Sequence, residues 1–383
     1  MSIWVDMKWA RVWVELGGQA DYADVRGVGD GMSKLNVGVL GCGPIAQAGH
    51  FESCTKARNA RLYAICDVAE DLRARRAATH APQKVFGDYQ QMLADPDLDA
   101  VIVATSDAFH VEASILALQA GKHVLCEKPL AMGLEQALAL QAVVQTSDRV
   151  FQVGHMKRFD IGLQTAKQFI DDEMGAMVAL KAWYCDSTHR YAVTDAVQPL
   201  IVKSALARKP PMDPKADLER YYMLAHGSHL LDTARYFGGE IVAVQARLSK
   251  DMGLYCWFVD VEFTSGTLGH LDLTVAVRMD WHEGFQIYGQ NGSVIGKTYN
   301  PWYYKSSEVD IFREKDGASY RPLGADGHFY RRQLEGFVDA VAGGVQTGAG
   351  IADGVASVRA MLAVARSVQT GGWVRLDAVA GAL

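Results

Sequence analysis

The sequence predicts an α/β protein with a doubly wound parallel sheet followed by a second α/β domain whose sheet is mostly antiparallel. Three observations support this fold class. Apolar runs of strand length alternate with helical segments up to about residue 150. In the second half, alternating runs flank glycine turns such as Ser265-Gly266 and Asn291-Gly292, which are typical of hairpins. A length of 383 residues also fits two domains better than one.

Composition excludes several partners and sites. Lys and Arg number 38 against 44 for Asp and Glu, and no block of like charge favours nucleic acid or an anionic membrane. The longest apolar runs are too short to span a bilayer, and the N-terminus lacks an export signal. The six cysteines form no C-x-x-C pair, which argues against a zinc ribbon or a disulfide framework. We therefore expect a cytoplasmic protein.

Residues 1–32 differ in pattern from the rest of the chain. Trp4, Trp9 and Trp13 approximate one helical stripe, and a Gly- and Asp-rich stretch then leads to Met32. Two interpretations remain open, a short arm that docks on a partner and sequence translated from a start codon set too early, of which we prefer the second. The expected division is an extension over 1–32, a first domain over 33–153 and a second over 154–383.

The first expected strand, 35–40, leads into a glycine turn. Gly41-Cys42-Gly43-Pro44-Ile45-Ala46 has the pattern G-x-G-x-x-A of a dinucleotide-binding unit. Gly41 permits the tight turn, Gly43 lets the backbone approach a pyrophosphate, and Ala46 lets the helix pack on the strand. The N-terminus of that helix, at Pro44 and Ile45, offers free N–H groups to the phosphates.

Asp67 follows the second expected strand, 62–66, where a carboxylate can accept hydrogen bonds from the hydroxyls of an adenosine ribose. A carboxylate at this place repels a 2′-phosphate, so we expect NAD rather than NADP. The alternative is that Asp67 merely caps the helix that runs through Leu72 and Ala77.

The alternation of strands and helices continues to about residue 150. Helical segments are expected near 89–93, 110–120 and 134–145, with strands at 100–104 and 123–126. Ligands of a doubly wound sheet bind at the carboxyl ends of its strands. The polar residues at those ends are Thr105, Ser106, His110, Glu127 and Lys128.

The run Ala120-Gly121-Lys122-His123-Val124-Leu125-Cys126-Glu127-Lys128-Pro129, with the glycine turn and His110, resembles the Gfo/Idh/MocA family from Leu35 onward. The resemblance implies a Rossmann domain, a larger α/β domain with a large open sheet that often forms a subunit interface, and NAD(P)-dependent oxidation of sugars, cyclitols or related polyols. It also implies a cis Lys128-Pro129 bond. Lys128 is then the donor to the reacting oxygen, and desolvation is expected to lower its pKa.

The segment after residue 154 supplies candidate substrate contacts. His155, Lys157 and Arg158 precede an amphipathic helix that carries Leu163 and Phe169. The resemblance places this segment at the substrate site, where Lys157 or Arg158 can bond polyol hydroxyls. A structural ion pair for Arg158 is the alternative.

His229 opens a later helix that ends at Gly238-Gly239. The family places its usual catalytic base here, with an aspartate four residues earlier to orient it, but that earlier residue is Ala225. His226 lies on roughly the same helical face and can assist His229 or contact the substrate. His226, His229 and Asp232 also have metal-compatible spacing, but no further ligand is indicated and the reaction needs no metal, so we expect Asp232 to brace the helix.

Residues 198–217 contain four prolines and are expected to form a long loop, as a lid, a subunit contact or a surface insertion. Aromatic residues of the second domain (Trp257, Phe263, Trp281, Phe285, Trp302) favour burial of its open face in a homo-oligomer, a dimer or tetramer. Two closing helices are expected near 328–341 and 352–368.

The leading functional hypothesis is an NAD-dependent sugar or inositol dehydrogenase in which Lys128 polarises the oxygen and His229 exchanges its proton. Two alternatives are a glycoside hydrolase or lyase that works by transient oxidation with a retained NAD, and a non-catalytic NAD(P)-binding sensor.

Overall fold

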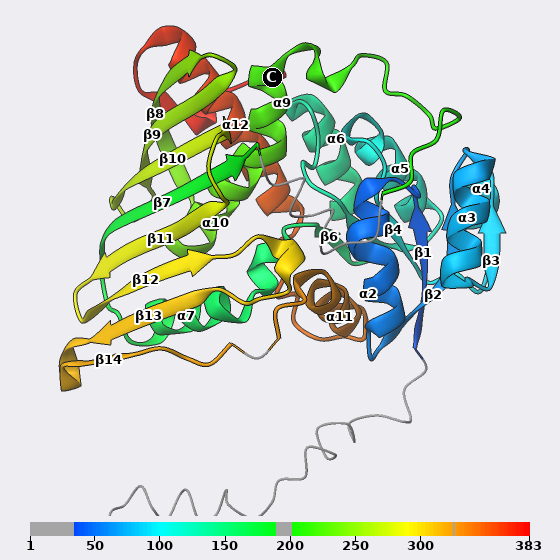
Figure 1. The fold of residues 1–383 in the computed structure, drawn as a ribbon, viewed down its shortest axis with the longest axis horizontal. Coiled ribbons are helices and arrows are strands. Elements are labelled where there is room, and N and C mark those ends of the chain that lie inside the picture. The colour runs from blue at the N-terminus through cyan, green and yellow to red at the C-terminus, as the bar shows by residue number, and fades with distance from the viewer. Residues whose placement is uncertain (1–33, 189–200, 325) are drawn as a thin grey trace, which may run out of the picture. The chain divides into compact units, whose positions relative to one another are not determined.

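A computed structural model describes residues 34–188, 201–324 and 326–383 of the chain and contains two sheets (Figure 1). The tryptophan stripe expected in the first 13 residues lies outside the described residues. No helix within the described ranges has the length and apolar character needed to cross a membrane.

The first sheet is parallel and has the strand order β3-β2-β1-β4-β5-β6. Its strands are β1 Leu35–Leu40, β2 Ala60–Cys66, β3 Lys84–Phe86, β4 Ala100–Val103, β5 His123–Cys126 and β6 Phe151–Val153. Its helices are α2 Phe51–Lys56, α3 Glu70–His80, α4 Tyr89–Leu93, α5 His110–Gln119 and α6 Leu134–Gln145. β4 is buried throughout, as expected for a parallel strand covered on both faces. The order reverses between β1 and β4, which creates the ligand crevice of a doubly wound sheet.

The second sheet is mostly antiparallel and has the order β14-β13-β12-β11-β7-β10-β9-β8-β15, with one parallel pair, β7 and β10. Its strands are β7 Met177–Ser187, β8 Ile241–Asp251, β9 Leu254–Phe263, β10 Leu268–Val277, β11 His282–Gly289, β12 Gly292–Thr298, β13 Glu308–Arg313, β14 Ala318–Tyr320 and β15 Val374–Arg375. Both sheets confirm the predicted fold class.

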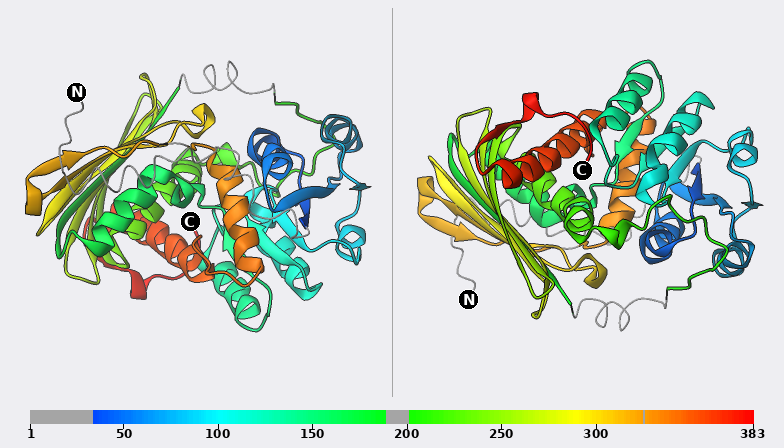
Figure 2. Two further views of the ribbon diagram at one scale, coloured as in Figure 1. Left: turned by 90° about the horizontal axis from the view of Figure 1, so that it is seen from below. Right: turned by 90° about the horizontal axis from the view of Figure 1, so that it is seen from above.

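Helices cover one face of the second sheet in the described part of the chain (Figure 2). They are α7 Ile161–Asp172, α10 Ser228–Gly238 and α12 Ile351–Thr370; α9 Leu218–Tyr222 precedes α10, and α11 Phe329–Val341 packs on the first sheet through Leu334 and Phe337. Along β9, Trp257, Val259 and Val261 are buried while Phe258 and Asp260 are exposed, so the strand alternates between a covered and an uncovered face.

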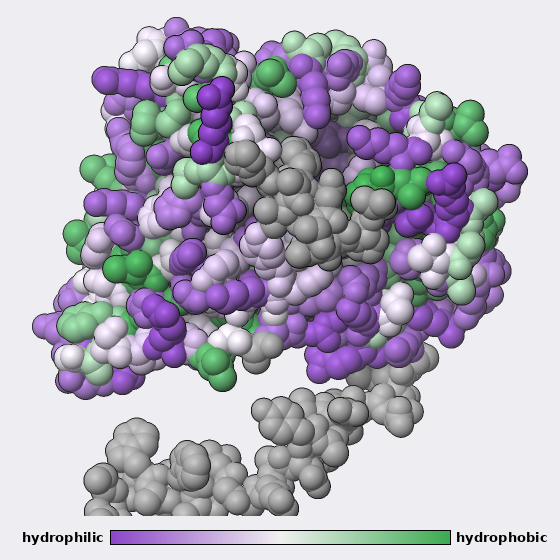
Figure 3. Space-filling view, viewed as in Figure 1, coloured by the Kyte–Doolittle hydropathy of each residue, from purple (hydrophilic) through white to green (hydrophobic). Residues whose placement is uncertain are grey.

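The aromatic argument for an oligomer is wrong for three of its residues. Trp257, Phe263 and Phe285 are buried within the chain, in the same core as helices α7, α10 and α12. Their burial therefore needs no second subunit. Apolar residues over the strands at the left of Figure 3 lie among polar ones rather than in one continuous patch. A homo-oligomer through the uncovered face stays a prediction.

Candidate active site

The glycine turn has the geometry that its sequence requires. Gly41 has a φ of +95°, and a Cβ atom there would lie 2.7 Å from the carbonyl oxygen of Ala104, so only glycine fits between β1 and β4. A Cβ atom on Gly43 would meet nothing within 4 Å, which leaves room for a ligand at that backbone. The helix begins at Pro44, a favoured residue for a first helical position, and Ala46 is fully buried.

Asp67 contacts the turn directly. Its Oδ2 atom accepts a hydrogen bond from the Cys42 N–H at 2.7 Å, and its Oδ1 atom accepts one from the Ala69 N–H at 2.9 Å, just before α3. The carboxylate therefore lies beside the glycine turn and contacts the residue before α3, but no side chain caps the first turn of that helix, so Asp67 is not its cap. Each oxygen retains a second lone pair for a ribose hydroxyl.

His110 joins the ends of two strands. Its Nδ1 atom lies 2.8 Å from the carbonyl oxygen of Pro129 and its Nε2 atom lies 3.2 Å from that of Thr105. A neutral ring can donate to only one of the two. Since both ring nitrogens face backbone carbonyls, the geometry gives His110 a positioning role, and places Thr105 and Ser106 at the open edge beside it.

Glu127 is an internal anchor for the Glu127-Lys128-Pro129 segment. Its Oε1 atom lies 2.9 Å from Nε2 of His50, and its Oε2 atom accepts a hydrogen bond from the Lys128 N–H at 3.1 Å. Burial raises the pKa of Glu127, but the hydrogen bond and charge of His50 and the charge of Lys128 outweigh it, so the net pKa lies below its usual value. The Lys128-Pro129 bond is cis, which confirms what the family resemblance implied.

Lys128 reaches the helix that carries the candidate histidines. Its Nζ atom donates to the carbonyl oxygen of Ala225 at 3.1 Å. Ala225 belongs to a π-helical segment, Met223–Gly227, and a second such segment, Ala46–His50, follows the glycine turn. π-Helical turns occur frequently at functional sites, because the inserted residue shifts the backbone bonds of the helix.

His226 and His229 both lie against Tyr184 of β7. The His229 ring stacks nearly parallel to the Tyr184 ring, with centroids 5.9 Å apart. The Nδ1 atom of His226 lies 3.2 Å from the Tyr184 hydroxyl, and its Nε2 atom lies 3.4 Å from Oδ2 of Asp186. In residues 34–188, 201–324 and 326–383, no carboxylate pairs with His229.

The environment of His229 favours the neutral ring. Burial is the largest cause that lowers its pKa well below the usual value, and the positive charges of Lys128 and Lys157 lower it further. A neutral imidazole can accept a proton at neutral pH.

Lys157 forms a buried ion pair with Glu283 of β11, and its Nζ atom lies 4.3 Å from the centroid of the Tyr184 ring. The other carboxylate oxygen of Glu283 is buried, and the indole N–H of Trp281 acts on the same carboxylate. Burial raises the pKa of Glu283, while the charge of Lys157 opposes that shift. Lys157, a predicted substrate contact, is thus buried and paired with a carboxylate of β11.

Arg158 has the structural role that was its alternative. It donates to both carboxylate oxygens of Asp232, at 3.0 and 2.7 Å, and to Asp353 of α12 at 2.9 Å. Asp232 thereby braces α10. His155 is also buried, with its Nδ1 atom 3.6 Å from Oδ2 of Asp232. Burial lowers the pKa of His155 to about 4.

Two of the three residues with metal-compatible spacing have other partners. Asp232 is held by Arg158, while His226 faces Asp186. The described residues contain no group of three or more His, Cys, Asp or Glu side chains able to hold a metal ion.

Sequence reasoning missed four residues of this site: His50, Tyr184, Asp186 and Glu283. His50 follows the glycine turn by one helical segment, but nothing in the sequence relates it to Glu127. Tyr184 and Asp186 are alternate residues of β7, so they share a face. Glu283 of β11 is the cross-strand neighbour of Tyr184. Strand alternation would have found the shared face, had β7 been recognised.

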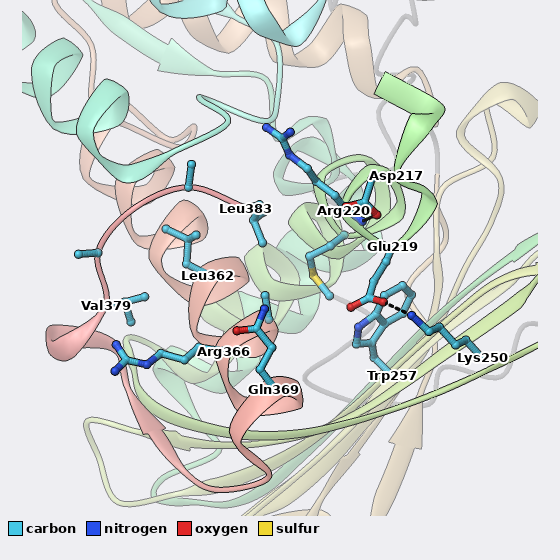
Figure 4. Close-up of a pocket in the computed structure, with 14 residues that line it drawn as sticks. Asp217, Glu219, Arg220, Lys250, Trp257, Leu362, Arg366, Gln369, Val379 and Leu383 are labelled. Atoms are coloured by element: carbon cyan, nitrogen blue, oxygen red, sulfur yellow. Dashed lines mark hydrogen bonds and ion pairs between the residues drawn. The ribbon is translucent and has the colours of Figure 1, made fainter. Parts of the chain in front are cut away.

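A cavity of about 500 Å³ lies elsewhere, between α9, α12 and the last residues of the chain (Figure 4). Glu219 and Lys250 form an ion pair across its wall at 2.7 Å. No residue predicted from the sequence as catalytic or substrate-binding lines this cavity. The candidate active site is therefore defined by its side chains at the strand ends.

Comparison with known proteins agrees with this arrangement. Residues 35–155 match the model of an oxidoreductase family with an NAD-binding Rossmann fold, and residues 163–295 match the GFO/IDH/MocA C-terminal domain. Inositol 2-dehydrogenase 2 of Saccharopolyspora erythraea is 30% identical over 347 residues, covering 88% of this chain and 94% of that protein. The chain belongs to the Gfo/Idh/MocA family. It is an NAD(P)-dependent oxidoreductase acting on CH–OH groups.

Further members of the Gfo/Idh/MocA family are also similar. Myo-inositol 2-dehydrogenase of Thermotoga maritima is 26% identical over 277 residues, covering 68% of this chain and 75% of that protein. The structure of levoglucosan dehydrogenase in complex with NADH and levoglucosan has a TM-score of 0.73 at 22% identity, over 90% of this chain and all of that chain. This structural likeness shows the shared fold.

Proposed function

We propose that the chain is an NAD-dependent dehydrogenase that oxidises one hydroxyl of a cyclitol, sugar or related polyol, or reduces the matching ketone. One observation carries the proposal: Lys128, at the end of β5, donates to the backbone of the helix that carries His229. Two groups suited to one hydroxyl, a cationic donor and a neutral base, are thereby held at the same strand-end crevice.

The residues present fit a dinucleotide. The turn at Gly41 is closed to any side chain, while the backbone at Gly43 is open, and the carboxylate of Asp67 lies beside them. When bound, the nicotinamide supplies the acceptor for the hydride that leaves the substrate carbon. Because the carboxylate at Asp67 would repel a 2′-phosphate, we propose NAD as the preferred cofactor.

Two residues of the chain then stabilise the reacting oxygen and accept its proton. Lys128 donates a hydrogen bond to the reacting oxygen and stabilises the negative charge that grows there. His229, kept neutral by burial, accepts the hydroxyl proton. In the reverse direction the same ring returns that proton to the alkoxide.

A second polar pair suits a polyol substrate. The ammonium of Lys157 is a donor, and the buried second oxygen of Glu283 is an acceptor. A molecule with several neighbouring hydroxyls can satisfy both, whereas a simple alcohol cannot. The relatives named inositol 2-dehydrogenase make cyclitols the first class to test.

The test is a screen for nicotinamide reduction over inositol isomers, monosaccharides and anhydrosugars, with NAD and NADP in parallel. We expect at least one polyol to reduce NAD faster than NADP. Aryl glycosides form a separate arm, because sugar release without net cofactor reduction would favour the hydrolase or lyase alternative. Dinucleotide binding without turnover of any compound would favour the sensor alternative.

A further inference from the structure

The proline-rich segment that precedes α9 crosses the nucleotide-binding edge of the first sheet. Residues 201–208, here called the strap, belong by sequence to the second half of the chain. In Figure 1 the green segment before α9 runs beside the helices of the first domain. Its contacts fall on three separate helical segments of that domain.

The first contact joins the strap to the glycine turn. The side-chain amide of Gln47 accepts a hydrogen bond from the Val202 N–H and donates one to the Val202 carbonyl, both at 2.9 Å. The same amide donates to the carbonyl of Cys42, inside the turn, at 2.8 Å. One side chain therefore connects the strap to the backbone expected to hold the pyrophosphate.

The second and third contacts lie at the neighbouring strand ends. The Ser204 hydroxyl donates to Oδ1 of Asp71, in the first turn of α3, at 2.6 Å. The guanidinium of Arg208 lies 4.1 Å from the centroid of the Phe109 ring, which follows Thr105 and Ser106 after β4. Val202 and Ala207 also pack against the core of the first domain.

Together these contacts surround the crevice between β1 and β4. Gln47 follows β1, Asp71 follows β2 and Phe109 follows β4, so all three contacts lie after the carboxyl ends of strands, where a doubly wound sheet binds its ligand. The strap is therefore fixed to the first domain at three points along this edge of the sheet.

We propose that the strap is a cofactor-retaining element, which must part from the first domain before a dinucleotide leaves its site. Its contacts are few and partly exposed, so it can open locally without unfolding the domain. This proposal requires only that the chain binds a dinucleotide, and it is independent of the polyol.

The experiment measures the rate at which bound NADH or NADPH leaves the full-length protein after mixing with excess ADP-ribose, followed by nicotinamide fluorescence. The variants are Ser204→Ala, Arg208→Ala and the double variant, and the matched control is Lys209→Ala, an exposed cation one residue beyond the strap. We expect the double variant to release the dinucleotide about tenfold faster, because two anchoring contacts are lost.

The control should release the dinucleotide at the parent rate, and the thermal midpoint of the ligand-free protein should be the same in all four variants. Faster release supports the proposal whether or not association also accelerates. A release rate within twofold of the parent in the double variant would overturn it, as would an equal acceleration in Lys209→Ala. No polyol is present, so failure here leaves the proposed dehydrogenase activity untouched.

Discussion

The Nε2 atom of His226 lies 3.4 Å from Oδ2 of Asp186, so the histidine that has a carboxylate partner is not the one that the family marks as the base. His229 instead stacks on Tyr184, whose hydroxyl lies 3.2 Å from the other nitrogen of His226. The aspartate expected in the helix is Ala225 here, and a carboxylate enters the site from β7 instead. Asp186 therefore orients His226 beside the proposed base.

Asp186→Asn should lower turnover of the polyol about tenfold to a hundredfold, because His226 loses the charge that fixes its tautomer and orientation. Steady-state kinetics with the substrate found in the screen would measure it. The matched control is Asp260→Asn, which alters an exposed Asp–His pair with His270 on the uncovered face of the same sheet. Equal turnover in Asp186→Asn and the parent would remove Asp186 from the site.

Asp67→Ser should shift cofactor preference toward NADP. The change removes the carboxylate that we propose accepts from ribose hydroxyls and repels a 2′-phosphate, so we expect about tenfold weaker NADH binding and tighter NADPH binding. Fluorescence titration with both cofactors measures the ratio. Glu70→Gln, which removes a nearby exposed carboxylate in the first turn of α3, serves as the control. A parent protein that already prefers NADPH would contradict the role given to Asp67.

Glu283→Gln should raise the KM for the polyol several-fold while leaving the affinity for NADH unchanged. The amide keeps the shape of the side chain but loses the charge that faces Lys157. Comparing KM with an independent NADH titration separates the substrate site from the cofactor site. Weaker NADH binding in this variant would show that the pair serves the fold or the cofactor instead.

His155 should make the protein less stable in mild acid. Its pKa is about 4 in the fold, because burial disfavours the charged ring, against 6.5 in the unfolded chain. Below pH 6.5 His155 therefore binds a proton in the unfolded chain but not in the native state. The free energy of unfolding falls as the pH decreases from 6.5 towards 4. Titration of His155 makes the free energy of unfolding about 2 kcal/mol smaller at pH 5 than at pH 7.

Urea unfolding of the parent and of His155→Gln at both pH values measures this contribution. The glutamine variant does not titrate, so its loss of stability between pH 7 and pH 5 should be smaller by about that amount. The same pH dependence in both proteins would mean that His155 is not the group responsible.

Much of the first domain was predictable because its strands are continuous apolar runs in the sequence. The observed bounds of β1, β5 and α6 equal the expected ones, since each run is closed by glycine, proline or a polar residue. β3 has only three residues, two of them exposed, and gives no pattern to read. β7 was missed although it alternates, because it is defined by pairing with β10 and β11, whose residues lie about 90 to 110 positions away.

The site divides in the same way. Gly41, Asp67 and Lys128 were recognisable because each follows a strand in a local motif. The partners Asp186 and Glu283 were not, because their places depend on the register of the second sheet, and the sequence does not specify which strands pair. For Arg158, the residue type alone favoured substrate binding. Only the positions of Asp232 and Asp353 show that it braces two helices.

In the proposed reaction Lys128 acts on the reacting oxygen. The most direct measurement is single-turnover reduction of NAD by the polyol found in the screen, comparing the parent with Lys128→Ala at saturating NAD. We predict that hydride transfer slows by at least about a hundredfold, as when one donor to a developing oxyanion is removed, while the affinity for NADH stays within about threefold. Hydride transfer in Lys128→Ala at the parent rate would contradict this role of Lys128.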